Sequence, residues 1–94
     1  MDKIWLVTRE TSVDGEIYFY VGPCATKEKA QEVFAETKND VFSTGHFADL
    51  TEEDIKEYCD IEENPNGDCP YFSIIDNTDS YYDVIKMYEE EIIE

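Results

Sequence analysis

Residues 62–73 combine carboxylate and amide side chains with a glycine at the spacing of a calcium-binding loop. Glu62, Asn64 and Asn66 would occupy loop positions 1, 3 and 5, and Gly67 falls at position 6, where such a loop turns sharply. Position 12 is a serine, however, whereas calcium needs a bidentate carboxylate there. We therefore interpret the Asn-Gly step as a turn between a second helix and a third strand.

Four other side chains have the chemistry of zinc ligands, namely Cys24, His46, Cys59 and Cys69. No two of them stand two to four residues apart, which is the usual spacing of a zinc-ligand pair. A disulfide between Cys59 and Cys69 would require an oxidising medium, so free thiols are the simpler expectation. We predict no metal and no cofactor.

Enzymatic motifs are missing from the sequence. It has no nucleophile elbow, no phosphate-binding glycine loop and no metalloprotease pattern, and His46 is its one histidine. Among 24 acidic residues, closeness in sequence singles out no catalytic pair of carboxylates. We predict a protein without enzymatic activity or catalytic residues, in which His46 is a loop residue.

The net charge of −17 is distributed unevenly. The first 47 residues carry 8 acids and 5 bases, whereas the last 47 carry 16 acids and 2 bases. Such a polyanion repels nucleic acid and anionic membranes and attracts basic proteins. We expect a basic protein surface as the partner, and neither nucleic acid nor membrane. The alternative is a housekeeping or structural domain whose acidity serves only solubility.

Six residues are candidates for a partner-binding surface. In a C-terminal strand, Glu89 and Glu91 would project from one face about 6.6 Å apart. Carboxylates at that pitch would fit phosphate-binding sites on a basic groove, as in DNA-mimic inhibitors, which this chain resembles in composition. Tyrosines often anchor interfaces, although packing on the sheet accounts for them equally well. The candidates are Tyr18, Tyr20, Tyr82, Tyr88, Glu89 and Glu91.

The elements that must position these residues form one domain, residues 1–94. Alternating apolar residues predict strands at 3–9 and 16–21, joined through Asp14-Gly15 as a hairpin with a slightly long loop. A helix of about three turns is then expected, capped by Thr26 and stopped at Asn39.

The second half contains a further helix and two further strands. Thr51 and Asp54 have the spacing of a capping box, so a short second helix follows them. Residues 41–49 are expected to be a loop whose two phenylalanines, Phe42 and Phe47, plug the edge of the core.

Residues 71–76 form the third predicted strand. Residues 81–93 fit both a helix and a strand, and we favour a strand, residues 83–94, because the four-residue turn at 77–80 suits a hairpin. The predicted fold is α+β, in the order β-β-α-α-β-β. It is a mostly antiparallel sheet of two hairpins with the helices on one face.

No apolar run approaches the roughly 20 residues that cross a bilayer, and the opening MDKIWLVTRE lacks the features of a signal peptide. A cytoplasmic location is therefore expected. Oligomeric state is not encoded in these patterns.

Two stretches resemble short uncharacterised proteins of gut Bacteroidetes and their mobile elements. They are the opening KIWLVTRETSVDGEIYFYVGPCATKEKAQEVF and the closing DSYYDVIKMYEEEI. Those proteins begin with a similar strand, a V-T-R-E-like step, a DGEI turn and a helix opened by ATKEKA. The resemblance implies a bacterial protein and supports a terminal strand. It implies no activity and no functional residue.

Overall fold

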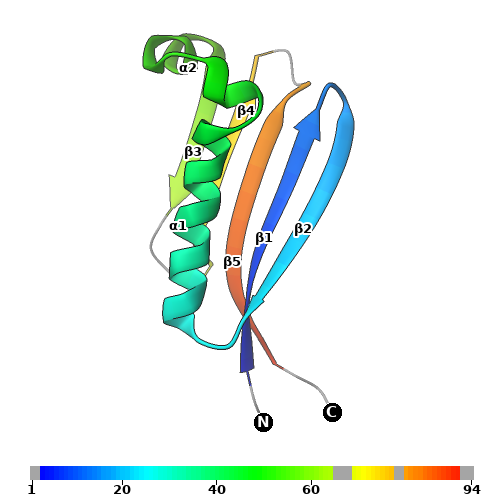
Figure 1. Cartoon of the computed structure of the whole chain (residues 1–94), viewed down its shortest axis with the longest axis vertical. Helices are drawn as coiled ribbons and strands as arrows, with labels where there is room; N and C mark the ends of the chain where they lie inside the picture. Colours follow the sequence, from blue (N-terminus) through cyan, green and yellow to red (C-terminus); the bar gives the residue numbers. More distant parts are fainter. Residues whose placement is uncertain (1–2, 65–68, 78–79, 92–94) are drawn as a thin grey trace.

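The structure, a computed structural model, describes residues 3–64, 69–77 and 80–91. Within these ranges a five-stranded antiparallel sheet is crossed on one face by a long helix (Figure 1). The strand order β2-β1-β5-β4-β3 makes the first and last strands neighbours at the centre of the sheet. The elements are β1 (Lys3–Val13), β2 (Glu16–Cys24), α1 (Lys27–Ser43), η1 (His46–Asp49), α2 (Glu52–Tyr58), β3 (Cys59–Asn64), β4 (Tyr71–Asp76) and β5 (Tyr82–Glu91).

β1 and β2 form the predicted first hairpin. Val13 pairs with Glu16, so the loop consists of Asp14 and Gly15, whose φ angles are 52° and 86°. Two positive φ values define a type I′ turn, whose twist matches that of the flanking strands. The predicted slightly long loop is wrong, because strand pairing continues up to this two-residue turn.

α1 begins where the sequence predicts. The Thr26 hydroxyl accepts a hydrogen bond from the backbone N–H of Lys29 at 3.1 Å. The predicted stop at Asn39 is wrong, since α1 continues to Ser43. The reason is burial: Val41 is fully buried in the core, which outweighs the weak helix-stopping preference of asparagine.

The predicted loop at residues 41–49 is therefore the end of α1 followed by the short 3₁₀-helix η1. Gly45, between them, has a φ of 84°, a backbone conformation that favours glycine. Phe47 is buried in the core, as predicted, whereas Phe42 is 36% exposed and its ring contacts the buried Phe72 ring edge-on at 5.8 Å.

α2 starts with the predicted capping box. The Thr51 hydroxyl accepts from the Asp54 N–H at 3.1 Å, and the Asp54 carboxylate accepts from the Thr51 N–H at 3.2 Å. After Tyr58 the chain enters β3, a strand that was not predicted. The order β-β-α-α-β-β is therefore wrong by one strand. β3 lies at the edge of the sheet and buries little, so its sequence, CDIEEN, has only a weak strand pattern.

The two remaining predicted strands are confirmed as β4 and β5, which pair as an antiparallel hairpin. Residues 92–94 lie outside the described residues, as do residues 65–68 of the calcium-loop candidate, which include the Asn66-Gly67 turn. Because Asn64 pairs with Tyr71, that stretch connects β3 to β4 and not, as predicted, a helix to a strand.

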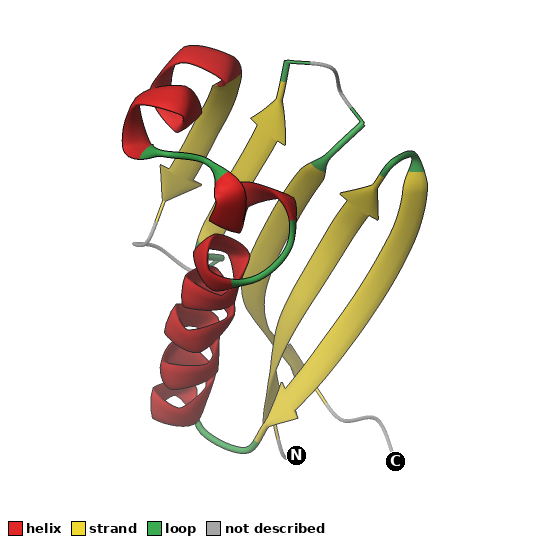
Figure 2. Cartoon of the chain, turned by 45° about the horizontal axis from the view of Figure 1, so that its top comes forward, coloured by secondary structure: helices red, strands yellow, loops and turns green. Residues whose placement is uncertain are grey.

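The core lies between α1 and the sheet (Figure 2). We call the face that carries Val7 and Ile85 the helix side, and the opposite face, which carries Leu6 and Val84, the open face. α1 contacts β5, β1 and β2, and most of β2 stands clear of the helix (Figure 1). The buried apolar residues of the core are Val7, Cys24, Ala30, Val41, Phe47, Phe72, Ile74, Ile85 and Met87.

None of the helices within the described ranges combines the length and the apolar character that crossing a membrane requires.

Candidate functional site

A groove of about 430 Å³ lies between the C-terminal half of α1 and the sheet. Arg9 and Tyr20 line it from the sheet, Thr37 and Asp40 line it from α1, and His46 lines its end. The groove brings polar side chains together from segments far apart in the sequence, which is the usual setting of a binding site.

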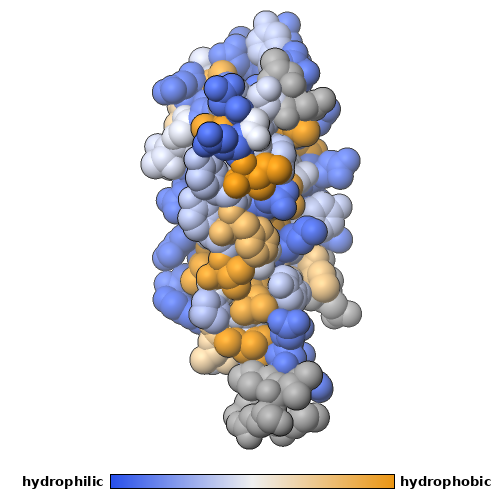
Figure 3. Space-filling view, turned by 90° about the vertical axis from the view of Figure 1, so that its right-hand side faces the viewer, coloured by the Kyte–Doolittle hydropathy of each residue, from blue (hydrophilic) through white to orange (hydrophobic). Residues whose placement is uncertain are grey.

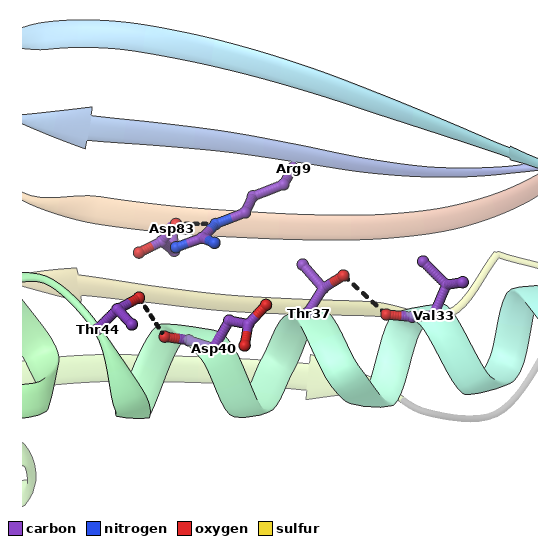
Figure 4. A network of polar contacts seen from close by, with 6 residues as sticks. All are labelled: Arg9, Val33, Thr37, Asp40, Thr44 and Asp83. Carbon is purple, nitrogen blue, oxygen red and sulfur yellow. Dashed lines mark hydrogen bonds and ion pairs between the residues drawn. The ribbon is translucent and has the colours of Figure 1, made fainter.

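The central polar contact of the groove is an ion pair between neighbouring strands (Figure 4). The Arg9 Nε donates to the Asp83 Oδ1 at 2.7 Å, and the two side chains are 22% and 6% exposed. Because Asp83 neutralises the guanidinium, the pair adds no net charge to the groove.

Hydroxyl donors on the α1 wall are used within the helix. The Thr37 hydroxyl donates to the Val33 carbonyl at 2.7 Å, and the Thr44 hydroxyl donates to the Asp40 carbonyl at 3.0 Å. The Asp40 carboxylate points from α1 toward the sheet (Figure 4). The groove is therefore a recess whose polar groups largely satisfy one another.

His46 is fixed at the end of the groove on two sides. Its Nε2 lies 3.1 Å from the Asp76 Oδ2, and its ring stacks on Tyr81 with centroids 3.9 Å apart and planes at 9°. The prediction that His46 is a loop residue is wrong, because it begins η1. A carboxylate partner and an aromatic stack orient the imidazole and pack it against the sheet.

Cys59 does not supply an activated nucleophile. Burial, with the negative charges of Asp76 and Asp60, raises the pKa of the Cys59 thiol above its ordinary value of 9.0. Cys59 is therefore protonated at neutral pH and a poor nucleophile. All three cysteines are free thiols, Cys24 buried and Cys69 exposed. Within the described ranges, no three His, Cys, Asp or Glu side chains are grouped as metal ligands would be.

The predicted partner-binding tyrosines fall on both faces of the sheet. Tyr18 and Tyr20 lie on the helix side of β2 and are 44% and 56% exposed. Tyr82 and Tyr88 lie on the open face of β5 and are half-buried. A hydrogen bond donated to Glu10 at 2.8 Å is the main cause of the raised pKa of Tyr82. These four tyrosines do not form one surface.

The predicted carboxylates, Glu89 and Glu91, lie together on the helix side of β5. The Glu89 carboxylate forms an ion pair with the Lys3 ammonium at 3.2 Å. One of the two negative charges is therefore partly offset within the chain.

Further exposed carboxylates lie on α2 and β3, which follow each other in the chain. Five exposed carboxylates on these two consecutive elements form no ion pair with a cation in the part of the chain that the structure describes. The neighbouring Glu63 is bound by the Lys38 ammonium at 2.6 Å. We call the five residues the acidic edge. They are Glu52, Glu53, Glu57, Asp60 and Glu62.

The opposite edge of the sheet is apolar. Ile17, Phe19 and Val21 point to the open face of β2 and are 64%, 60% and 51% exposed. A hydrophobic band runs along this side of the molecule (Figure 3). We call residues 17–21 of β2 the apolar edge. The sequence predicted this strand, but its position at the edge of the sheet depends on pairings that local patterns do not encode.

Comparison with protein-family models, with curated proteins and with solved structures gave no match to this chain. The resemblance to short proteins of gut Bacteroidetes therefore stays a prediction.

Proposed function

We propose that this protein is a non-enzymatic module that binds a basic protein surface through its acidic edge. The observation that supports the proposal is the succession of five exposed carboxylates along α2 and β3, none of which is ion-paired with a cation in the described part of the chain. Opposite charge in a partner would accelerate association and select basic surfaces over neutral ones.

A nucleic-acid-processing protein is the partner class we propose. Such proteins hold the phosphate backbone with lysine and arginine side chains. Asp60 and Glu62 lie two residues apart on one face of β3, so their carboxylates are spaced by about 6.6 Å along the strand. In this form of the proposal the acidic edge occupies the lysine- and arginine-lined groove of the partner protein and competes with nucleic acid for it.

The alternative function is a housekeeping or structural domain whose acidity serves only solubility. In that case every exposed carboxylate contributes in the same way, whatever its position. The two possibilities therefore differ in whether the location of the charge matters.

Two variants that lose the same number of charges test whether the location of the negative charge matters. One variant carries Glu57→Gln, Asp60→Asn and Glu62→Gln on the acidic edge. The control carries Glu28→Gln, Glu32→Gln and Glu36→Gln on α1, so both lose three negative charges. Each protein is immobilised and exposed to bacterial lysate at low ionic strength, and captured proteins are quantified and then challenged with duplex DNA.

We expect the wild-type protein and the control to retain a basic protein that duplex DNA displaces. The acidic-edge variant should retain roughly tenfold less of this basic protein. Its capture by the wild-type protein should decline steeply as the salt concentration rises. Equal losses in the two variants would support solubility alone. Recovery of no basic protein at low salt would count against a basic partner altogether.

A further inference from the structure

The apolar edge lacks the usual protection of an edge strand. β2 pairs with β1 alone in the described sheet, and residues 17–21 contain no charge in a chain of net charge −17. Edge strands are normally shielded by charged side chains, prolines or bulges. β3, at the opposite edge, follows that rule with its acids, whereas β2 has only Glu16 at its start and Pro23 near its end.

Backbone geometry shows which groups of β2 point outward. The Met87 N–H donates to the Pro70 carbonyl at 3.0 Å, so Met87 directs its backbone groups away from β1. Opposite residues in an antiparallel pair exchange both hydrogen bonds or neither. Val7, opposite Met87, therefore bonds to its other neighbour, Gly22.

Along β2, residues whose backbone groups bond to β1 alternate with residues whose backbone groups do not, and Gly22 is one of the bonded residues. Tyr18 and Tyr20 therefore bond to β1, while Ile17, Phe19 and Val21 direct their N–H and C=O groups out of the sheet. These outward groups could bond to another extended strand.

We propose that β2 pairs antiparallel with β2 of a second copy of this chain, about a two-fold axis at Phe19. In this register Phe19 faces Phe19 of the partner subunit, and Ile17 faces Val21 of the partner subunit. Every outward-pointing residue then meets another outward-pointing residue, and each such pair exchanges two hydrogen bonds. The interface is isologous, as a two-fold dimer requires.

Neighbouring registers are poorer. An axis at Tyr18 sets Val21 opposite Gly15 of the partner subunit, which lies in the turn. An axis at Tyr20 sets Ile17 opposite Pro23 of the partner subunit, which has no N–H to donate. Only the axis at Phe19 satisfies all the outward groups.

Charge also favours a second copy at this edge. In the proposed register Glu16 faces Gly22 of the partner subunit, so no carboxylates lie directly opposite each other. The acidic edge, in contrast, would repel its own copy. An uncharged strand offers a basic partner nothing that the acidic edge does not offer more strongly.

The buried area would be that of a reversible dimer. From their exposed fractions, the side chains of residues 17–21 present on the order of 500 Å² per chain. Two copies would bury at most about 1,000 Å², the size of weak and transient interfaces. The dimer should therefore depend on protein concentration. It should also strengthen with salt, which screens repulsion between two polyanions, whereas binding through the acidic edge should weaken.

Disulfide trapping tests the register. In a background with Cys59→Ser and Cys69→Ser, Phe19→Cys would place two thiols across the axis with Cα atoms about 5.5 Å apart, within disulfide range. The control Tyr18→Cys lies opposite Tyr20 of the partner subunit, not opposite its own copy. We expect mild oxidation to cross-link Phe19→Cys at least roughly tenfold faster. Equal rates, faster cross-linking of Tyr18→Cys, or none in either would overturn the proposed register.

Sedimentation equilibrium tests the dimer itself. Phe19→Lys sets two cations opposite each other and should raise the dimer dissociation constant at least roughly tenfold. The control Tyr71→Lys changes an aromatic residue on the open face of β4 that is 37% exposed and far from β2 in the sheet order. It should leave the constant unchanged, and circular dichroism checks that both variants fold.

Two outcomes would contradict the proposal. A dimer disrupted by Tyr71→Lys and not by Phe19→Lys would show that the open faces pack together instead. A wild-type protein that is monomeric at roughly 100 μM and 0.5 M salt would exclude self-association of useful strength. Neither outcome bears on capture of a basic protein through the acidic edge.

Discussion

Arg9 and Asp83 show how single residues connect distant parts of this chain. They are 74 positions apart, yet the Arg9 Nε and the Asp83 Oδ1 lie 2.7 Å apart. Such a pair is sensitive to the loss of one partner, because the remaining charge stays partly buried.

A double-mutant cycle should reveal this sensitivity. We expect Asp83→Leu to lower the free energy of unfolding by roughly 3 kcal/mol, the lower part of the range for buried pairs, since Arg9 is still 22% exposed. Arg9→Met combined with Asp83→Leu should be closer to the wild type than either single change. Chemical denaturation measures all four proteins, and additive losses would contradict a coupled pair.

Cys59 allows a prediction about pH. Burial and the charges of Asp76 and Asp60 raise its pKa, so its thiolate forms only at a pH above the ordinary value. Asp60→Asn should lower the pKa and shift the pH profile of Cys59 alkylation to lower pH. Mass spectrometry of iodoacetamide-treated protein measures the profile, and Glu62→Gln serves as the control. An unchanged profile would show that Asp60 does not act on the thiol.

Tyr82 gives a second pH prediction, through stability. Its hydrogen bond to Glu10 raises the pKa above 10.0 in the folded state, so the folded state holds the phenolic proton more tightly than the unfolded state. The resulting stability is present below pH 10 and lost as the pH rises through the folded-state pKa. In Tyr82→Phe the loss of stability above pH 10 should be smaller, as measured by urea unfolding between pH 8 and pH 11.

At the scale of elements, α2 differs from α1 in what stabilises it. α1 buries Ala30 and Val41, whereas α2 has no buried residue and depends on its capping box. An element with little buried surface opens locally at low free energy.

Removal of the cap should therefore affect α2 locally. We expect Thr51→Ala to destabilise α2 by about 1 kcal/mol. Hydrogen exchange of the backbone amides in residues 52–58 should become faster. Thr26→Ala is the matched control, because its helix is also held by packing. If exchange in α2 were no faster in Thr51→Ala than in the wild type, the capping box would not be what holds the helix.

The sequence predicted those elements that depend on a few adjacent residues. The Asp14-Gly15 turn, the caps at Thr26 and Thr51, and the β4–β5 hairpin all depend on a few adjacent residues. β3 and the true end of α1 could not be predicted, because edge pairing in the first case and burial of Val41 in the second decide them. The same limit applies to the site, since the groove and the apolar edge arise from contacts between strands remote in sequence.

At the scale of the whole molecule, charge and shape act together. The molecule measures 46 × 25 × 19 Å. At 0.01 M salt the Debye length of about 30 Å exceeds its two shorter dimensions, so carboxylates on all sides repel one another. At 0.15 M salt a Debye length of about 8 Å confines that repulsion to close neighbours.

Salt should therefore stabilise the fold. We expect the Tm to rise between 0.01 M and 0.15 M sodium chloride as self-repulsion is screened. Differential scanning calorimetry should be repeated on Phe19→Lys, which separates this effect from dimer formation. A flat Tm in that variant would mean that the charges are already well spread or paired.

The place of β5 beside β1 has a consequence for synthesis on the ribosome. After residue 24 emerges, β1 can pair with β2 at once, but it can pair with β5 only after residues 82–91 have been synthesised. At 5–20 residues per second this interval lasts roughly 3 to 13 s. During it, the nascent hairpin exposes two unpaired edges, one of which contains the uncharged residues 17–21. Chaperone dependence should therefore peak before β5 is translated, and the centre of the sheet is the last part of the fold that can form.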